Sequence, residues 1–209
     1  RAAQPDADAL GVGDGSTDAP AERAAAAGAQ VMRLPFNLGV GGAMRAAYRW
    51  ARDRGYRQVI QVDADGQHDA AELETLLAVQ AADPSIDIVI GSRFAGKGDY
   101  PVRGPRRWAM RMLSVALTSI VGTDVTDPTS GFRLVNRRAL ALWAEHYPEE
   151  YLGDTVETLI YAVRRGFTVR QVPVAMRARM AGTPSHSPVK AMIYLFRAAF
   201  VLILSVVRR

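Results

Sequence analysis

The chain has 209 residues, a formal net charge of +5 and no cysteine, so it is long enough for one large domain, while a disulfide framework and a thiolate metal site are excluded. Hydrophobic residues make up 49% of the chain and charged residues 22%, which is not the composition of a disordered protein. The basic excess is arginine and suits phosphates, anionic lipid or nucleic acid. These arginines are not interleaved with aromatic residues as stacking platforms require, so we expect no nucleic-acid partner.

The first half of the chain alternates between two hydrophobic periodicities. Strands are predicted at 9–13, 29–34, 58–65 and 87–94, and helices at 19–28, 42–54 and 69–82. This order predicts an α/β fold with a mostly parallel sheet flanked by helices. Such a sheet ordinarily begins with a strand at the N-terminus, whereas residues 1–10 read as a loop or the end of a helix. We therefore expect the first strand to be missing.

The second half is less regular. Helices are predicted at 105–121, 136–146 and 153–166, and a strand at 167–176. We interpret residues 1–188 as one domain. Residues 189–209 form an apolar segment interrupted by Arg197, which is predicted to be an interfacial helix or the start of a membrane segment. A core helix is the alternative.

Polar side chains follow the predicted strands at their carboxyl ends. They are Asp14, Asn37, Asp63 with Asp65, and Ser92 with Arg93. Ligands of parallel α/β sheets bind at this edge, so these side chains are expected to converge on one site.

Asp63 and Asp65 are two residues apart at the end of a buried strand. Carboxylates held side by side repel each other and favour a cation between them. Mg²⁺ or Mn²⁺ is the expected ion, since both prefer oxygen ligands and leave positions open for substrate phosphates. Gln67 would add a carbonyl oxygen, and His68 would be a softer ligand. Asp69 is interpreted instead as the N-cap of the next helix.

Asp14 precedes a glycine turn and is expected to accept a hydrogen bond from a nucleotide base or ribose, with Asp18 capping the helix that follows. The alternative for Asp14 is a purely structural Asx turn. The glycine-rich "NLGVGG" lacks the spacing of a dinucleotide fingerprint and of a P-loop. A phosphate at the next helix N-terminus and close backbone packing remain equal alternatives.

Several motifs combine in a specific order. They are "GDGSTD", "NLGVGGAMRAAYRWA", "VIQVDADGQHD", "VIGSRF", "DPTSGFRLVNRRAL", "GDTVETLIYAVRRGFTVRQVPV" and "RMAGTPS". With these motifs, residues 9–190 resemble family 2 glycosyltransferases of the GT-A fold. The resemblance is greatest to the dolichol-phosphate mannosyltransferase branch, which moves a sugar from a nucleotide to a polyprenyl phosphate.

The resemblance implies roles for individual residues. Asp14 matches the second acid of a nucleoside-contacting turn, although Gly13 stands where the family has the first acid. The metal and diphosphate site would be Asp63, Asp65 and Gln67. The lipid phosphate would meet Arg93 and Arg107, with Arg106 as an alternate.

Further positions are implied to bind substrate in the same way. They are Asp127 and Asp154 with Glu157, which flank the sugar pocket, together with Arg133 and the mobile-loop residue Arg179. The catalytic set implied is Asp65, Arg93 and Asp154. Because a phosphate acceptor is already ionised, it needs positioning more than a general base; Asp154 would be the base for a hydroxyl acceptor.

The expected partners are a nucleotide-sugar donor, a polyprenyl phosphate acceptor, the membrane surface and a membrane partner protein, at the cytoplasmic face of the cell membrane. Transfer is expected to invert the sugar's configuration. Two rival hypotheses remain. One is a glycosyltransferase with a soluble or protein acceptor, and the other is a nucleotide-sugar-binding protein without catalysis.

Overall fold

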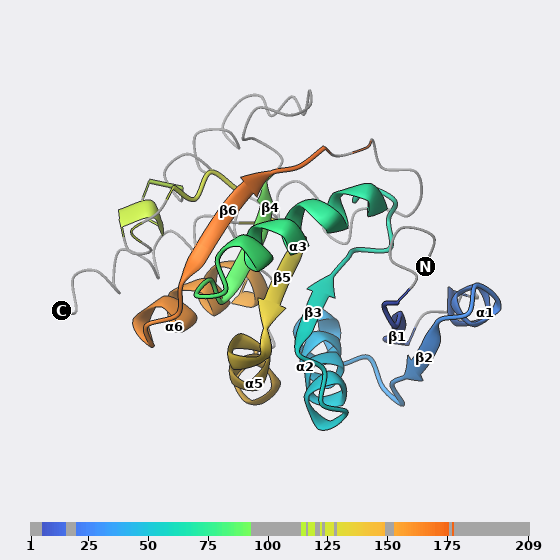
Figure 1. Cartoon of the computed structure of the whole chain (residues 1–209). Coiled ribbons are helices and arrows are strands. Elements are labelled where there is room, and N and C mark those ends of the chain that lie inside the picture. Colours follow the sequence, from blue (N-terminus) through green and yellow to red (C-terminus); the bar gives the residue numbers. More distant parts are fainter. Residues whose placement is uncertain are drawn as a thin grey trace, which may run out of the picture.

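The structure is a computed structural model of the whole chain (Figure 1). It describes residues 6–15, 20–92, 114–115, 117–119, 122, 124–127, 129–148, 153–175 and 177. The tail at 189–209 lies outside these residues. So does most of the helix predicted at 105–121, of which 114–115 and 117–119 are helical.

The elements follow one another as the sequence predicts, with one addition. In order they are β1 (Leu10–Gly13), α1 (Pro20–Ala26), β2 (Gln30–Arg33), α2 (Gly39–Asp53), β3 (Gln58–Gln61), η1 (Ala70–Glu72), α3 (Leu73–Ala82), β4 (Ile88–Ser92), β5 (Arg133–Asn136), α5 (Arg137–Glu145), η2 (Gly153–Glu157), α6 (Thr158–Arg164) and β6 (Val169–Pro173). The added element is β5, a strand that the sequence reading missed. The single helix predicted at 153–166 is divided between the π-helical turn η2 and the α-helix α6.

The described strands form two sheets. β1 and β2 pair in parallel, and a second sheet has the order β3-β5-β4-β6. β5 runs antiparallel to both of its neighbours, while β4 and β6 are parallel. The predicted sheet is therefore mixed rather than a continuous parallel one, with β3, β4 and β6 sharing one direction and β5 reversed between β3 and β4.

Alternation along the strands builds two core layers on the larger sheet. Ile88 and Ile90 of β4 face α2, α5 and α6, where Tyr48, Trp143 and Tyr147 pack ring against ring at 5.3–5.7 Å. Other side chains of β4 and β5 face α3 in a second cluster that contains Val89, Leu134, Leu76 and Phe132. In Figure 1, α3 crosses one face of the sheet. The sheet is thus held between helices, as an α/β fold requires.

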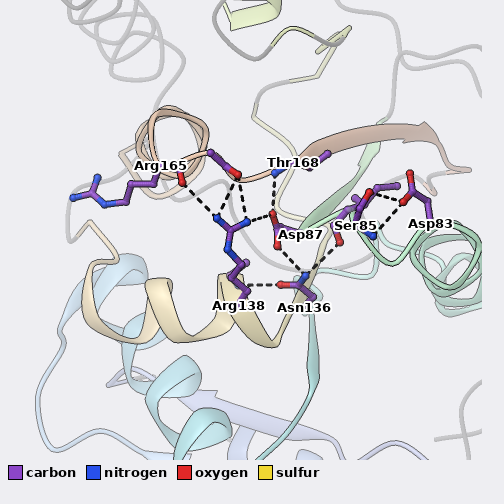
Figure 2. A network of polar contacts seen from close by, with 10 residues as sticks. Asp83, Ser85, Asp87, Asn136, Arg138, Arg165 and Thr168 are labelled. Atoms are coloured by element: carbon purple, nitrogen blue, oxygen red, sulfur yellow. Dashed lines mark hydrogen bonds and ion pairs between the residues drawn. The ribbon is translucent and has the colours of Figure 1, made fainter.

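A buried carboxylate closes the end of the sheet at which β4 begins (Figure 2). Asp87 is 3% exposed. It accepts hydrogen bonds from Asn136 Nδ2 at 2.9 Å, Arg138 Nη1 at 2.8 Å and the Thr168 N–H at 2.9 Å. The guanidinium of Arg138 also lies 3.9 Å from the centre of the Phe167 ring. This network ties β4 to β5, α5 and the turn before β6, at the end of the sheet opposite the predicted acidic site.

Within the described residues, the structure contains no helix long and apolar enough to cross a membrane.

Candidate functional site

The predicted acids lie in the turn that follows β3 at its carboxyl end. The Asp63 side chain is 51% exposed, and Asp65 is half-buried. The Gln67 N–H donates to Asp65 Oδ1 at 3.0 Å, and Gly66 between them has φ of 76°, a left-handed conformation that glycine adopts without strain. The turn therefore orients the Asp65 carboxylate through its own backbone. We call residues 63–69 the acid turn.

Gly131 allows a second loop to approach the acid turn closely. A Cβ built on Gly131 would lie 3.0 Å from Asp63 Oδ2, 3.1 Å from Asp63 Oδ1 and 3.3 Å from Gln61 Nε2. Contacts of 3.0 Å between a real Cβ and a carboxylate oxygen are strained, so the packing depends on the missing side chain. The loop at 127–131 is thereby brought against the acids.

Asp69 is the N-cap that the sequence predicts. Its Oδ1 accepts the Ala71 N–H at 3.1 Å at the start of η1. Its Oδ2 accepts from Arg177 Nε at 3.1 Å and Nη2 at 2.8 Å. Two hydrogen bonds lower the pKa of Asp69 below its ordinary value, and the one from the Ala71 amide has a larger effect than the one from Arg177. Asp69 thus anchors the acid turn.

The chain leaving β6 is fastened to the acid turn by backbone contacts as well. The Arg177 N–H donates to the Gln67 carbonyl at 2.9 Å, and the Ala175 N–H donates to Glu72 Oε1 at 3.0 Å. Together with the Arg177–Asp69 pair, these bonds hold the C-terminal part of the acid turn and the start of the following helical turn against Ala175 and Arg177. The backbone of Gln67, a predicted metal ligand, is therefore held in place through its main-chain carbonyl.

Asp14 lies at the end of β1 and faces the start of α2. The Leu38 N–H donates to Asp14 Oδ1 at 2.6 Å, and Asn37 joins the two segments by donating from Nδ2 to the Asp14 carbonyl at 3.2 Å and accepting the Gly39 N–H at 3.0 Å. Side-chain oxygens of Asp14 and Asn37 therefore accept two of the N–H groups at the start of α2. Of the two alternatives for "NLGVGG", close packing is observed, and the phosphate site stays a prediction. A Cβ on Gly42 would lie 2.6 Å from the Leu38 Cβ.

Asp127 is fully buried in the loop that leads to Gly131. Its Oδ1 accepts from Thr129 Oγ1 at 3.2 Å. Its backbone is held by Gln171 of β6, whose Oε1 accepts the Thr126 N–H at 2.6 Å and the Asp127 N–H at 3.1 Å, while Nε2 donates to the Asp127 carbonyl at 2.9 Å. The Gln171 amide thus acts as a template for this loop. The predicted role of Asp127 beside a sugar pocket stays a prediction.

Arg133, predicted to bind substrate, is fully buried in β5. Its Nε donates to the Ser130 carbonyl at 2.8 Å, its Nη1 to Thr158 Oγ1 at 3.1 Å and its Nη2 to the Thr155 carbonyl at 3.0 Å. Because the side chain exposes no surface, the structure does not support the predicted direct contact with substrate. Arg133 instead joins the loop before β5 to η2, the turn that carries Asp154. π-Helical turns are common at functional sites.

Of the remaining predicted site residues, Glu157 is exposed at the end of η2, and the others lie outside what the structure describes. These are Arg93, Arg106, Arg107 and Arg179, together with the side chain of Asp154, whose backbone lies in η2.

The described residues contain no group of three or more His, Cys, Asp or Glu side chains able to hold a metal ion. Asp63 and Asp65 therefore offer at most two carboxylates from one turn. This donor set fits Mg²⁺ or Mn²⁺ better than a closed structural site, because these ions take further oxygens from water or from substrate phosphates.

Sequence reasoning missed three residues that shape the site. Gly131 supports Asp63, Gln171 holds the loop at 126–127, and Arg177 holds the acid turn. A signal existed for Gly131, which follows "PTS" in the sequence and lies two positions before β5. Gln171 and Arg177 carry no local signal because their partners are distant in sequence.

With this geometry established, comparison with known proteins defines the family. Residues 4–143 match the family described as Glycosyl transferase family 2. The chain belongs to this family. It is 30% identical over 176 residues to the polyprenol monophosphomannose synthase of Mycolicibacterium smegmatis, an alignment that covers 81% of this chain and 64% of that protein. It is 32% identical over 198 residues to the undecaprenyl-phosphate mannosyltransferase of Micrococcus luteus, covering 90% of this chain and 79% of that protein.

Solved structures confirm the predicted fold class. Glucosyl-3-phosphoglycerate synthase from Mycobacterium tuberculosis, in complex with phosphoglyceric acid, superposes with a TM-score of 0.69 at 22% identity, covering 95% of this chain and 68% of that one. The same enzyme with Mn²⁺ and uridine-diphosphate-glucose gives a TM-score of 0.64 at 21% identity, covering 93% of this chain and 66% of that one. The chain therefore has the α/β fold of GT-A glycosyltransferases.

Proposed function

We propose that this glycosyltransferase moves a sugar from a nucleotide-sugar donor to a polyprenyl phosphate. The observation that carries the proposal is the likeness to two proteins named for mannosyl transfer to polyprenyl phosphates, over 81% and 90% of the chain. The acid turn supports it, since carboxylates at the carboxyl end of a strand suit a nucleoside diphosphate bound through a divalent cation.

The donor end of the site is assigned to Asp63, Asp65 and Gln67. Asp63 is exposed, and Asp65 is oriented by the Gln67 N–H at 3.0 Å. These residues would hold Mg²⁺ or Mn²⁺ with the donor diphosphate; structural neighbours were solved with Mn²⁺ and uridine-diphosphate-glucose. A divalent ion bound there would neutralise charge on the departing nucleoside diphosphate. Asp14 is proposed to contact the nucleoside through the carboxylate oxygen that does not bind the Leu38 amide.

In the transfer step, an oxygen of the acceptor phosphate forms a bond to the anomeric carbon of the sugar. The bond from that carbon to the diphosphate oxygen breaks, and its electrons leave with the nucleoside diphosphate. A phosphate monoester is largely ionised near neutral pH, because its second pKa is about 6, so the nucleophile needs no general base. Arg93, Arg106 and Arg107 are proposed to position it through charge-assisted hydrogen bonds.

Such an acceptor places the reaction at a membrane surface, where the isoprenoid chain is embedded. The proposed location is the cytoplasmic face, with the apolar residues 189–209 contributing to membrane contact. A membrane partner protein is part of the same proposal.

A second candidate is transfer to a small phosphorylated acceptor in water. The solved neighbours favour this alternative, since one was determined with phosphoglyceric acid bound. Both candidates share the donor site and differ in the acceptor.

The test incubates the full-length protein with membranes, Mg²⁺ or Mn²⁺ and a panel of labelled nucleotide sugars, and follows label into the organic phase. Metal-dependent label in that phase supports the proposal and identifies the donor. Label that stays in water while donor is consumed favours a soluble acceptor or hydrolysis. If no donor is consumed, a binding protein without catalysis replaces the proposal. Asp65→Ala is expected to abolish transfer, and metal-dependent activity retained by that variant would remove Asp65 from the site.

A further inference from the structure

The side chain of His68 lies on the buried side of the acid turn rather than on its open side. The imidazole is 4% exposed, although its neighbours on the turn reach solvent. Its ring stacks on that of Phe132, with the ring centres 4.9 Å apart and the planes at 21°. This burial fixes the orientation of the ring, so the contacts of its two nitrogens are defined.

Both ring nitrogens face the same residue. The Asp63 N–H donates to His68 Nδ1 at 3.0 Å, and His68 Nε2 lies 4.0 Å from Asp63 Oδ2. A ring nitrogen that accepts an amide hydrogen carries no proton of its own. The neutral ring therefore has its hydrogen on Nε2, which lies on the side of the Asp63 carboxylate. At 4.0 Å this contact is too long for a hydrogen bond, but the N–H dipole still favours a carboxylate on that side.

We propose that His68 is a positioning residue, which holds Asp63 from behind as the neutral Nε2–H tautomer and is not itself a metal ligand. The assignment deepens the proposed function, on which it rests. In this tautomer the lone pair of Nδ1 is used by the Asp63 amide, and Nε2 has none to offer. Coordination through Nε2 would move the proton to Nδ1 and break the bond to the Asp63 amide.

The loop at 131–132 completes this arrangement. Gly131 lies against the Asp63 carboxylate, since a Cβ added to Gly131 would lie 3.0 Å from Asp63 Oδ2. The ring of Phe132 stacks on that of His68. Adjacent residues of one strand end therefore contact both members of the His68–Asp63 pair. Outer residues of this kind orient metal-binding side chains, and their loss typically costs tenfold to a hundredfold in affinity.

The first test reads the tautomer directly. Long-range ¹H–¹⁵N NMR of the full-length protein with ¹⁵N-labelled histidine distinguishes protonated from unprotonated ring nitrogens. We expect an unprotonated Nδ1 and a protonated Nε2 for His68, unchanged when Mg²⁺ is added. A protonated Nδ1, or an Nε2 signal that changes to the metal-bound type with Mg²⁺, would overturn the proposal.

The second test compares two variants that both remove Nε2. In His68→Asn, the side-chain oxygen takes the place of Nδ1 and keeps an acceptor for the Asp63 amide, whereas His68→Leu removes it. Mn²⁺ binding is measured by electron paramagnetic resonance without donor, and thermal unfolding shows whether each variant is folded. A positioning role predicts affinity close to wild type for His68→Asn and about tenfold weaker binding for His68→Leu. Equal losses of Mn²⁺ affinity in both folded variants would indicate that His68 is a metal ligand. Wild-type Mn²⁺ affinity in both variants would show that His68 has no role in the site.

The two proposals fail in different ways. If the wild-type protein binds no divalent ion but His68 shows the expected tautomer, the metal-dependent part of the proposed function fails while the pairing with Asp63 stands. If sugar transfer is established and His68→Leu binds Mn²⁺ as the wild type does, the positioning role fails alone. If His68→Leu does not fold, His68→Asn and the NMR signals decide the question.

Discussion

The carboxylate of Asp63 lies against the backbone of Gly131, so that a Cβ added to Gly131 would lie only 3.0 Å from Asp63 Oδ2. The two residues are 68 positions apart in the sequence, and they belong to different motifs. Gly131→Ala should therefore displace the carboxylate while leaving the fold intact. We expect metal affinity and the rate of transfer to fall by about tenfold, because reacting groups tolerate little displacement.

Gly13→Ala provides a matched control for this substitution. Gly13 also lies at a strand end, but a Cβ there would meet nothing closer than the Met32 carbonyl at 3.9 Å. Mn²⁺ titration without donor compares the two variants, because Gly13 precedes the proposed nucleoside contact Asp14 and its effect on transfer rates is a separate question. Equal effects, or an unchanged Mn²⁺ affinity in Gly131→Ala, would show that the close contact does not matter for the site.

The order of the elements could be read from the sequence because each carries a local signal. The helix 42–54 is bounded by glycines and is observed as Gly39–Asp53, and the strand predicted at 87–94 is observed as Ile88–Ser92. Asp69 was identified as a cap because capping depends on residues two positions apart. Signals that depend on nearby residues therefore sufficed for most of the fold.

The parts that could not be predicted depend on pairing across the chain. β5 has four residues and begins with Arg133, whose burial depends on carbonyl and hydroxyl groups of residues 130, 155 and 158. An arginine in a short apolar run suggests a surface loop until those partners are known. For the same reason the place of β5 between β3 and β4 was not foreseen. The substrate contact expected for Arg133 came from the family resemblance, which carries no information on the burial of this side chain.

Gln171 is predicted to control the loop that carries Asp127. Gln171→Leu keeps the size of the side chain but removes the acceptor for two backbone N–H groups and the donor to the Asp127 carbonyl. Thr126 is exposed, so its N–H can bind water instead, whereas the two backbone groups of the buried Asp127 would lose their partner. A buried group left without a partner costs about 1–3 kcal/mol, so the free energy of unfolding should fall by about that amount. If this loop borders the sugar, transfer should fall more than donor affinity.

Arg170→Gln is the control for Gln171→Leu, because Arg170 is the preceding residue of β6 and is exposed. Chemical denaturation and the separate measurement of kcat and KM compare the two variants. A Gln171→Leu protein with wild-type stability would contradict the template role of the amide.

Asp87 is predicted to matter for stability and not for chemistry. It lies at the end of the sheet away from the acid turn, and Asp87→Ala would leave Asn136 Nδ2 and the Thr168 N–H without their carboxylate. Breaking a buried network of this kind costs about 3 kcal/mol. The exposed pair Arg52–Asp53, 2.9 Å apart, offers a contrast, since Asp53→Ala should change the free energy of unfolding by no more than about 1 kcal/mol. Urea denaturation measures both, and similar losses would contradict the prediction.

Asp69 should make stability depend on pH at the acidic end. Hydrogen bonds from the Ala71 amide and Arg177 lower its pKa in the folded protein below the ordinary value of 3.8. The unfolded chain therefore binds a proton first as pH falls, so the stabilisation is complete above the unfolded pKa and is lost as pH drops through the folded one. Asp69→Asn keeps a capping oxygen for the Ala71 amide but has no charge to titrate.

The urea midpoint of Asp69→Asn should accordingly lie below that of the wild type at neutral pH. The gap should narrow as pH falls below 3.8 and close once Asp69 is protonated in both folded and unfolded protein. Other acids with lowered pKa values, such as Asp83 beside Ser85, are present in both proteins and cancel in the difference. A gap that stays constant down to the acid limit would mean that the Arg177–Asp69 pair adds nothing to stability through its charge.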